Sequence, residues 1–413
     1  MALSYLPITC SYLSTIHVSG SRARPIHPIV PSGTRYLSKK QQNDDYDDQV
    51  DRTATMPAEL PNEYSTTYHA PVMWNECIQA LLESRRSQAR DQEPLIFVDG
   101  TLGGGGHSAA LLERLEAGDI LLGCDVDPNA LNTASKRLAH YMNHDGNEKP
   151  YFIPVQSNFG DLKSALPEVR HPVTNLPILA VPSNEDNSAG AVGVDGILLD
   201  LGVSSHQIDT PERGFAFMKD GPLDMRMGTE AAGGLTAADL CNELDDKELQ
   251  RIFSVFGDEP RAKTIASAIV NHRPLSTTQD LVTAIGSVTP AFAKNKRKGR
   301  TATCARVFQS LRIVVNQEDR VLEKVLADAC PALIRPGGRL VVLSYHSMED
   351  RATKRIMRDG TVQRVQQEKD IYGNTLGPLK PFKPVGKRQT ASERELEKNP
   401  RSRSASLRIA ERQ

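Results

Sequence analysis

The chain has 413 residues with 50 Lys and Arg against 51 Asp and Glu, and this near-neutral balance neither favours nor excludes a nucleic-acid partner. Its six cysteines are scattered without a Cys-x-x-Cys pair, which argues against a zinc ribbon or a disulfide framework and fits a reducing compartment. No stretch approaches about 18 uninterrupted apolar residues, so we expect no membrane span.

The N-terminal segment differs in composition from the rest of the chain. Its first 43 residues contain no Asp or Glu but include Arg, Lys and many Ser and Thr residues. Such a composition is typical of organelle transit peptides, although prolines interrupt any amphipathic helix here. We predict that residues 1–60 are a transit peptide or a disordered extension, and that the protein resides in the mitochondrial matrix. Another organelle or the cytoplasm is the alternative.

The first predicted strand, residues 95–99, runs into a loop of four glycines, Gly103 to Gly106. Residues without Cβ let the backbone turn sharply and approach a ligand. A helix is predicted at 108–117 and a second strand at 120–124, which ends in Asp125. An acidic residue about 20 positions beyond a glycine-rich turn can accept the hydroxyls of a ribose. This pattern predicts a nucleoside-containing cofactor. A nicotinamide cofactor and a plain tight turn are the alternatives.

The elements that follow alternate between strand and helix. We predict a helix at 128–141, a strand at 151–155, a surface insertion at 171–193 and a strand at 194–200. Residues 235–309 then read as helical, followed by a long helix at 306–333 and a strand at 339–345. The pattern indicates an α/β domain, residues 61–210 and 310–360, with a helical domain, 211–309, inserted after the fourth strand. Residues 361–413 are predicted to be a basic C-terminal tail.

The strand ends hold the residues that carry the predicted chemistry, since ligands bind beyond the carboxyl ends of such strands. Asp200 ends the fourth strand and can accept hydrogen bonds from a nucleobase amine, as methyl transfer to that amine requires. Tyr345 ends the later strand and is our candidate for stacking on a base turned out of the RNA, with Phe215 and Phe217 as alternates. A metal site at these histidine-containing strand ends is an alternative that we do not adopt, because no short ligand spacing is present.

One short run is strongly basic. It contains Lys294, Lys296, Arg297, Lys298 and Arg300. Basic runs are often only solvated loops, but beside a nucleoside-type site they become candidates for contacts with RNA phosphates. We predict that these five residues bind RNA.

From about residue 69 to 411 the chain resembles the S-adenosylmethionine-dependent small-subunit ribosomal RNA (cytosine-N4)-methyltransferases of bacteria and organelles. The resemblance rests on motifs that include Asp99-Gly-Thr-Leu-Gly-Gly-Gly-Gly-His, Asp195-Gly-Ile-Leu-Leu-Asp-Leu-Gly-Val-Ser-Ser, Glu212-Arg-Gly-Phe-Ala-Phe-Met, Ser344-Tyr-His-Ser-Met-Glu-Asp and Asn399-Pro-Arg-Ser-Arg-Ser. The N-terminal extension suggests an organellar member. The chain departs from the family at His206, where the family commonly has Pro.

The resemblance implies a Rossmann-like class I methyltransferase with an inserted helical domain that holds RNA. It implies that Gly105, Gly106 and His107 line the methionine end of S-adenosylmethionine, that Asp125 binds its ribose and Phe159 flanks its adenine, and that Asp200 and Gln207 complete the pocket. The implied partner is small-subunit ribosomal RNA or an immature small subunit. The oligomeric state is left open. A methyltransferase acting on another nucleic acid or on protein, and a non-catalytic ribosome-assembly factor, are the rival functions.

Overall fold

The computed structural model describes residues 71–84, 94–142, 148–179, 193–228, 234–291, 299–362, 368–369, 375–376 and 380–413. The predicted N-terminal extension, residues 1–60, and four members of the basic run, Lys294, Lys296, Arg297 and Lys298, lie outside these residues. Within the described part of the chain, no helix is long and apolar enough to cross a membrane.

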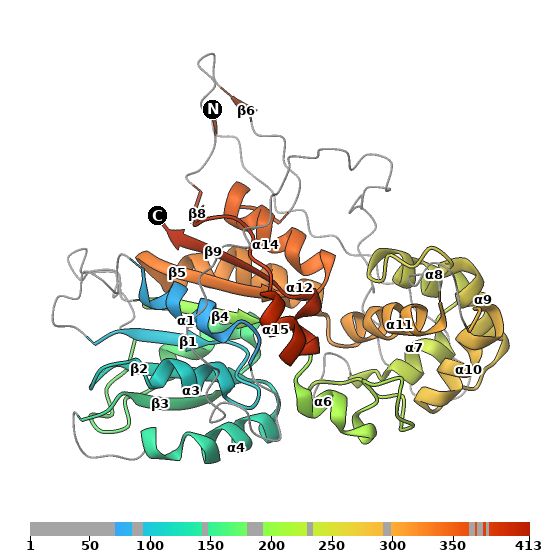
Figure 1. The fold of residues 1–413 in the computed structure, drawn as a ribbon, viewed down its shortest axis with the longest axis horizontal. Helices are drawn as coiled ribbons and strands as arrows, with labels where there is room; N and C mark the ends of the chain where they lie inside the picture. Colours follow the sequence, from blue (N-terminus) through green and yellow to red (C-terminus); the bar gives the residue numbers. More distant parts are fainter. Residues whose placement is uncertain are drawn as a thin grey trace, which may run out of the picture.

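A seven-stranded sheet forms the centre of the larger domain, in the strand order β3-β2-β1-β4-β5-β9-β8 (Figure 1). The strands from β3 to β5 are parallel, whereas β9 runs antiparallel to both β5 and β8. The strands are β1 (Ile96–Asp99), β2 (Ile120–Asp125), β3 (Tyr151–Gln156), β4 (Val194–Asp200), β5 (Ile334–Ser344), β8 (Phe382–Pro384) and β9 (Ser406–Arg412). The order reverses between β1 and β4, so their carboxyl ends open a crevice at this point. This is the predicted Rossmann-like class I methyltransferase architecture.

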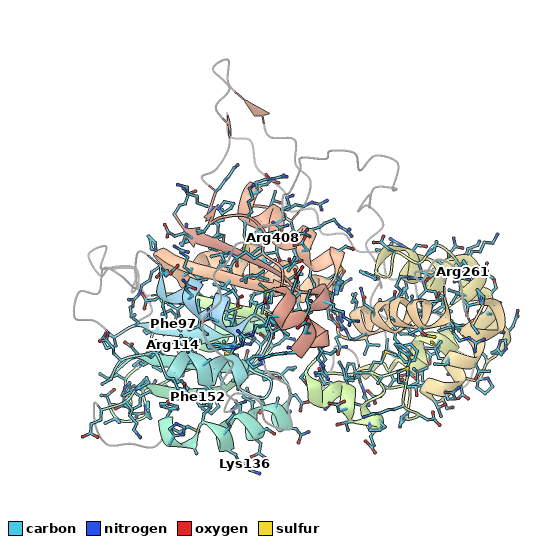
Figure 2. The ribbon with its side chains drawn as sticks, in the orientation of Figure 1. Phe97, Arg114, Lys136, Phe152, Arg261 and Arg408 are labelled. Atoms are coloured by element: carbon cyan, nitrogen blue, oxygen red, sulfur yellow. The ribbon has the colours of Figure 1, made fainter. Side chains whose placement is uncertain are left out.

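Helices cover both faces of the sheet because side chains alternate along each strand. Phe97 and Phe152, labelled in Figure 2, point into one core, whereas Ile96 and Val98 point into the other. The first core is completed by α1 (Trp74–Leu82), α3 (Gly106–Leu112) and α4 (Pro128–Arg137). The second is completed by α5 (Leu162–Ala165), α12 (Glu318–Lys324), α13 (Cys330–Leu333) and α14 (Ser347–Asp359).

The inserted helical domain has a third hydrophobic core of its own and lies to one side of the sheet domain in Figure 1. It consists of α7 (Ala237–Glu243), α8 (Asp246–Val255), α9 (Ala262–Asn271), α10 (Thr278–Val288) and α11 (Arg300–Val315). Capping boxes begin three of these helices, at Thr236, Asp245 and Thr277. Each box satisfies backbone N–H groups that would otherwise lack partners, which fixes the start of the helix.

The prediction of one long helix over 306–333 is wrong. The chain forms α11, turns at Asn316 and Gln317, and resumes as α12, a π-helical turn (Val325–Ala329) and α13. Gln317 has a left-handed backbone with φ of 50°, which ends a right-handed helix. The core of the helical domain therefore extends to Val315, beyond the predicted boundary at residue 309.

The prediction that residues 361–413 form a basic tail also needs correction. Two strands of this segment, β8 and β9, complete the sheet, and α15 (Glu393–Lys398) lies between them in sequence. Leu407 and Ala410 are fully buried, and Arg408 forms an ion pair with Asp350 at 2.7 Å. The basic residues of this segment suggested an exposed tail. In the structure, a basic residue such as Arg408 has an acidic partner within the fold, so the strand can pack in the sheet. Two further short strands, β6 (Glu368–Lys369) and β7 (Thr375–Leu376), pair with each other.

Candidate active site

A cavity of about 880 Å³ lies at the carboxyl ends of β1, β2, β4 and β5, where the sheet domain meets the helical domain. Residues from both domains line it, so neither domain alone makes the site. Its wall includes every predicted cofactor residue except Gly105: Gly106, His107, Asp125, Phe159, Asp200 and Gln207. The three aromatic candidates for base stacking line the same cavity: Phe215, Phe217 and Tyr345.

The glycine loop divides its residues between two tasks. Gly103 has φ of 51°, lines the cavity and donates its backbone N–H to Asp125 at 2.8 Å. Gly105 instead faces α4, where an added Cβ would lie 3.2 Å from the Ala134 side chain. Its φ of 72° begins α3 and lets that helix pack closely against α4. Contact of Gly105 with a cofactor stays a prediction.

Asp125 lies at the end of β2 with both carboxylate oxygens in use. One accepts the backbone N–H of Gly103 and the other that of Asp127, each at 2.8 Å. Burial raises the pKa of Asp125 to about 6, and the two backbone hydrogen bonds oppose this rise. Each carboxylate oxygen can accept more than one hydrogen bond, so the group can still bind the two hydroxyls of a ribose.

Asp200 stands at the end of β4 between two side chains from other elements. The Tyr345 hydroxyl donates to its Oδ1 at 2.6 Å, and the Nδ1 atom of His107 lies 3.6 Å from its Oδ2. The Nε2 atom of His107 is in turn 3.0 Å from the Val72 carbonyl oxygen, which fixes the ring. Burial raises the pKa of Asp200, while His107 and the Tyr345 hydroxyl lower it. The result is a carboxylate held rigidly at the cavity wall.

Tyr345 thus has a role that the sequence did not predict: its hydroxyl group orients the carboxylate of Asp200. Its ring also lies against the backbone of Gly202, where an added Cβ would be 3.2 Å from Cδ2 of the ring. Stacking of Tyr345 on a base stays a prediction. Phe217 packs edge-on against Phe308 with ring centroids 5.7 Å apart, which joins the cavity wall to the helical-domain core.

Comparison with known proteins matches residues 66–413 to the model of the MraW methylase family. The chain is 40% identical over 360 residues to ribosomal RNA small subunit methyltransferase H of Chlorobium luteolum, covering 84% of this chain and 97% of that protein. It is also 40% identical over 351 residues to the protein of the same name from Geobacter sulfurreducens, covering 84% and 99%. The chain belongs to the MraW methylase family.

One solved structure, of SAM-dependent methyltransferases from Methanosarcina mazei, covers 78% of this chain and 93% of that chain at 10% identity. Its TM-score of 0.25 is too low to inform either fold or function. Family membership, together with the strand order, makes this chain an S-adenosylmethionine-dependent methyltransferase.

The residues of the cavity fit this cofactor. At Gly106, an added Cβ would lie 3.2 Å from Pro71, so a side chain there would crowd the loop that lines the cavity. Asp125 offers acceptors suited to a ribose, and Phe159 offers a partly buried ring at the end of β3. Gln207 is buried, and its side-chain oxygen accepts the Ser204 backbone N–H at 2.9 Å, which fixes the amide at the cavity wall.

Arg300 is the described member of the predicted RNA-binding run, and it does not line the cavity. It is half-buried at the start of α11, where its guanidinium donates to the Gly286 carbonyl oxygen at 3.3 Å. The structure therefore gives Arg300 a contact within the helical domain. RNA binding by the run stays a prediction.

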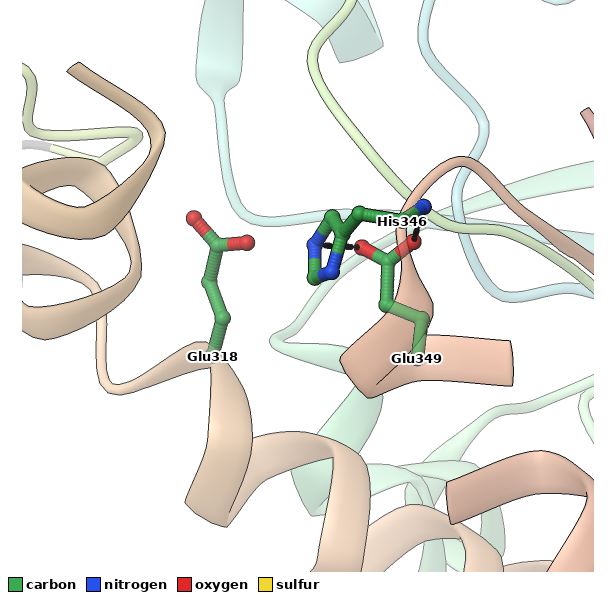
Figure 3. A group of neighbouring side chains, drawn as sticks. All are labelled: Glu318, His346 and Glu349. Atoms are coloured by element: carbon green, nitrogen blue, oxygen red, sulfur yellow. Dashed lines mark hydrogen bonds and ion pairs between the residues drawn. The ribbon is translucent and has the colours of Figure 1, made fainter. Parts of the chain in front are cut away.

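Glu318, His346 and Glu349 are grouped closely enough to suggest metal ligands (Figure 3). Their charges are already matched, however. Arg312 binds both oxygens of Glu318 at 2.7 Å, and the Nε2 atom of His346 lies 2.7 Å from Glu349. Glu349 also accepts the backbone N–H of Tyr345 at 2.8 Å. The Arg312–Glu318 pair joins the end of α11 to the start of α12, and Glu349 holds the turn between β5 and α14 through Tyr345 and His346.

Sequence reasoning missed the ion pair that joins the domains at the cavity and the hydrogen bonds that support it. Arg213 forms an ion pair with Asp127 at 2.8 Å and donates to two backbone carbonyls of the 226–227 turn. Asn316 binds the same turn through Met225 and Met227, at 2.8 Å each. A charged residue in a turn indicates only that the position is polar. The local sequence does not show which distant residues Arg213 and Asn316 contact.

Proposed function

We propose that this chain transfers the methyl group of S-adenosylmethionine to the exocyclic N4 amine of a cytosine in small-subunit ribosomal RNA. The relatives at 40% identity are named as methyltransferases of this RNA, and they match nearly along their full length. The observation that carries the proposal is Asp200, a carboxylate held at a strand end in the cavity by Tyr345.

The bound cofactor supplies an electrophilic methyl group on a sulfonium. The amine of cytosine is a weak nucleophile, because its lone pair is delocalised into the ring. The Oδ2 atom of Asp200 can accept an N–H from that amine, which orients the amine, returns electron density to the nitrogen and gives an acceptor for the proton that the nitrogen loses when it gains the methyl group. The hydrogen bond from Tyr345 to Oδ1 orients the carboxylate and leaves Oδ2 able to accept the amine N–H. Phe215 and Phe217 offer flat apolar surface to a base turned out of the RNA.

Two rivals remain as outcomes of the test. Amino-methyltransferases of DNA carry a Pro-Pro-aromatic sequence after the acidic residue, whereas Asp200 is followed by Leu-Gly-Val, which disfavours DNA. A non-catalytic assembly factor would bind cofactor and subunits without turnover.

The test is incubation of the purified protein and labelled S-adenosylmethionine with immature small subunits, followed by nucleoside analysis. We expect label in N4-methylcytidine with the parent protein and none with Asp200→Ala. Label in another nucleoside or in ribosomal protein would overturn the assignment. Binding of subunits without any label would favour the assembly factor.

We further propose that the protein acts in the mitochondrial matrix on immature ribosomal subunits. The acid-free, Arg- and Ser-containing N-terminal segment supports this location. Import of the full chain into isolated mitochondria, with removal of the N-terminal segment, is the expected result. Exclusion from mitochondria would refute it.

A further inference from the structure

Three segments meet at the rim of the cavity around a single carboxylate, that of Asp209. This residue ends α6 (Ser205–Asp209), which begins shortly after Asp200. The Lys219 ammonium donates to its backbone carbonyl at 2.8 Å and lies 3.8 Å from its carboxylate. The Arg401 guanidinium approaches the same carboxylate at 3.6 Å. All three line the cavity, and the Asp209 and Lys219 side chains are about half exposed, so they stand at its opening.

The fold brings Arg401 here through the antiparallel end of the sheet. Arg401 belongs to a 3-10 turn (Pro400–Ser404) directly before β9, and Ser406 of β9 pairs with Ser344 of β5. That pairing places the turn beside Tyr345, which follows Ser344. In Figure 1 the chain between α15 and β9 lies between the sheet domain and α6, in agreement with the Arg401–Asp209 contact.

Cations gather at this rim. Lys219 and Arg401 both approach the carboxylate of Asp209, and Arg403, two residues beyond Arg401, is exposed. Ion pairs this exposed contribute only about 0–1 kcal/mol, so an incoming anion can replace Asp209 at little cost. A guanidinium binds a phosphate through two parallel hydrogen bonds, and an ammonium binds one as a point charge.

Resting on the proposed function, we propose that Lys219 and Arg401 bind the phosphodiester groups that flank the target nucleotide. A base that enters the cavity leaves its sugar-phosphate backbone at the opening, where these two cations stand. Phosphate contacts fix position and register without reading sequence. Asp209 then serves as a placeholder, because it holds both cations at the rim until RNA displaces it.

The test measures binding of the full-length protein to a fluorescent single-stranded oligocytidylate RNA, over a series of KCl concentrations. Lys219→Gln and Arg401→Gln should each weaken binding roughly three- to tenfold and reduce the salt slope by about 0.7. Asp209→Asn should strengthen binding, because it removes the competing carboxylate and keeps the shape of the side chain. Lys163→Gln is the matched control, since Lys163 is an equally exposed lysine paired with Asp328 outside the cavity.

The Asp209→Asn arm separates a phosphate site from a purely structural ion cluster. If Asp209→Asn weakens RNA binding, or if the two cation variants match Lys163→Gln, the inference is wrong. Unfolding temperature and cofactor affinity of each variant, measured in parallel, identify any loss due to misfolding. The parent protein's methylation of small subunits is scored separately. If the parent protein methylates small subunits but the variants bind RNA as the parent does, this inference alone is overturned. If the variants show the expected changes in RNA binding and salt slope but the parent protein does not methylate, only the proposed function is overturned.

Discussion

Asp125 couples cofactor binding to pH. Its pKa of about 6 arises mainly from burial, and the ribose hydroxyls should donate to its ionised form. Binding therefore favours the carboxylate, so affinity for S-adenosylmethionine should be full above pH 6 and fall as the pH drops below it. Calorimetric titrations at pH values spaced about one unit apart, from pH 5 to pH 8, would show this dependence of affinity on pH. Asp125→Asn should bind more weakly and without the slope; a parent affinity flat across this range would contradict the assignment.

Asp200 and Tyr345 should separate in their kinetic effects. Asp200→Asn removes the negative charge that accepts the amine N–H, so turnover should fall roughly 10²–10⁴-fold with little change in cofactor affinity. Tyr345→Phe deletes a hydrogen bond that lowers the pKa of Asp200, so the acid limb of the turnover profile should move to higher pH. An unshifted profile in Tyr345→Phe would show that the hydroxyl does not act through Asp200.

At the scale of elements, local signals explain which predictions succeed. Thr236, Asp245 and Thr277 cap the N-termini of helices α7, α8 and α10, and each is followed three residues later by the acidic residue that completes the capping box. The break before α12 carries no Gly or Pro. Its cause is Asn316, which binds a turn about 90 residues earlier in the chain, and a contact of that range leaves no local pattern.

The break also stores strain that can be measured. Gln317 has φ of 50°, a conformation that glycine adopts without a Cβ penalty. Gln317→Gly should raise the free energy of unfolding by about 0.5–1 kcal/mol. The matched control is Gln79→Gly in the middle of α1, which should lower it by about 1 kcal/mol. Denaturant unfolding measures both, and equal losses in the two variants would show that Gln317 is not strained.

At the scale of the whole molecule, the active site is a product of both domains. The sheet's strand ends, with Asp125 and Asp200, follow from sequence because parallel strands align their carboxyl ends. The wall opposite them follows only from the packing of the inserted domain, which places Phe308 and Arg312 on the same cavity. Long-range contacts set that packing, and for this reason the rim around Asp209 could not be predicted from the sequence.

The link between Arg213 and Asp127 should hold the two domains in register. The Asp127 side chain is 5% exposed, so Arg213→Met leaves a buried, unpaired carboxylate and should reduce the free energy of unfolding by about 3 kcal/mol. Adding Asp127→Asn removes that charge but keeps the N-cap of α4, since an amide oxygen can still accept the Asn129 N–H. The double variant should therefore be more stable than Arg213→Met alone.

Activity should not recover with stability. Arg213 also donates to the carbonyls of Arg226 and Met227, in the turn that Asn316 holds from the helical domain, and methionine cannot replace these bonds. The double variant lacks both these bonds and the ion pair with Asp127, so the helical wall of the cavity loses its anchor to the cofactor side. We expect kcat/KM for RNA to stay low in the double variant while its unfolding free energy approaches that of the parent. If kcat/KM and the free energy of unfolding both recover in the double variant, Arg213 serves only to neutralise Asp127, and the position of the helical domain does not depend on Arg213.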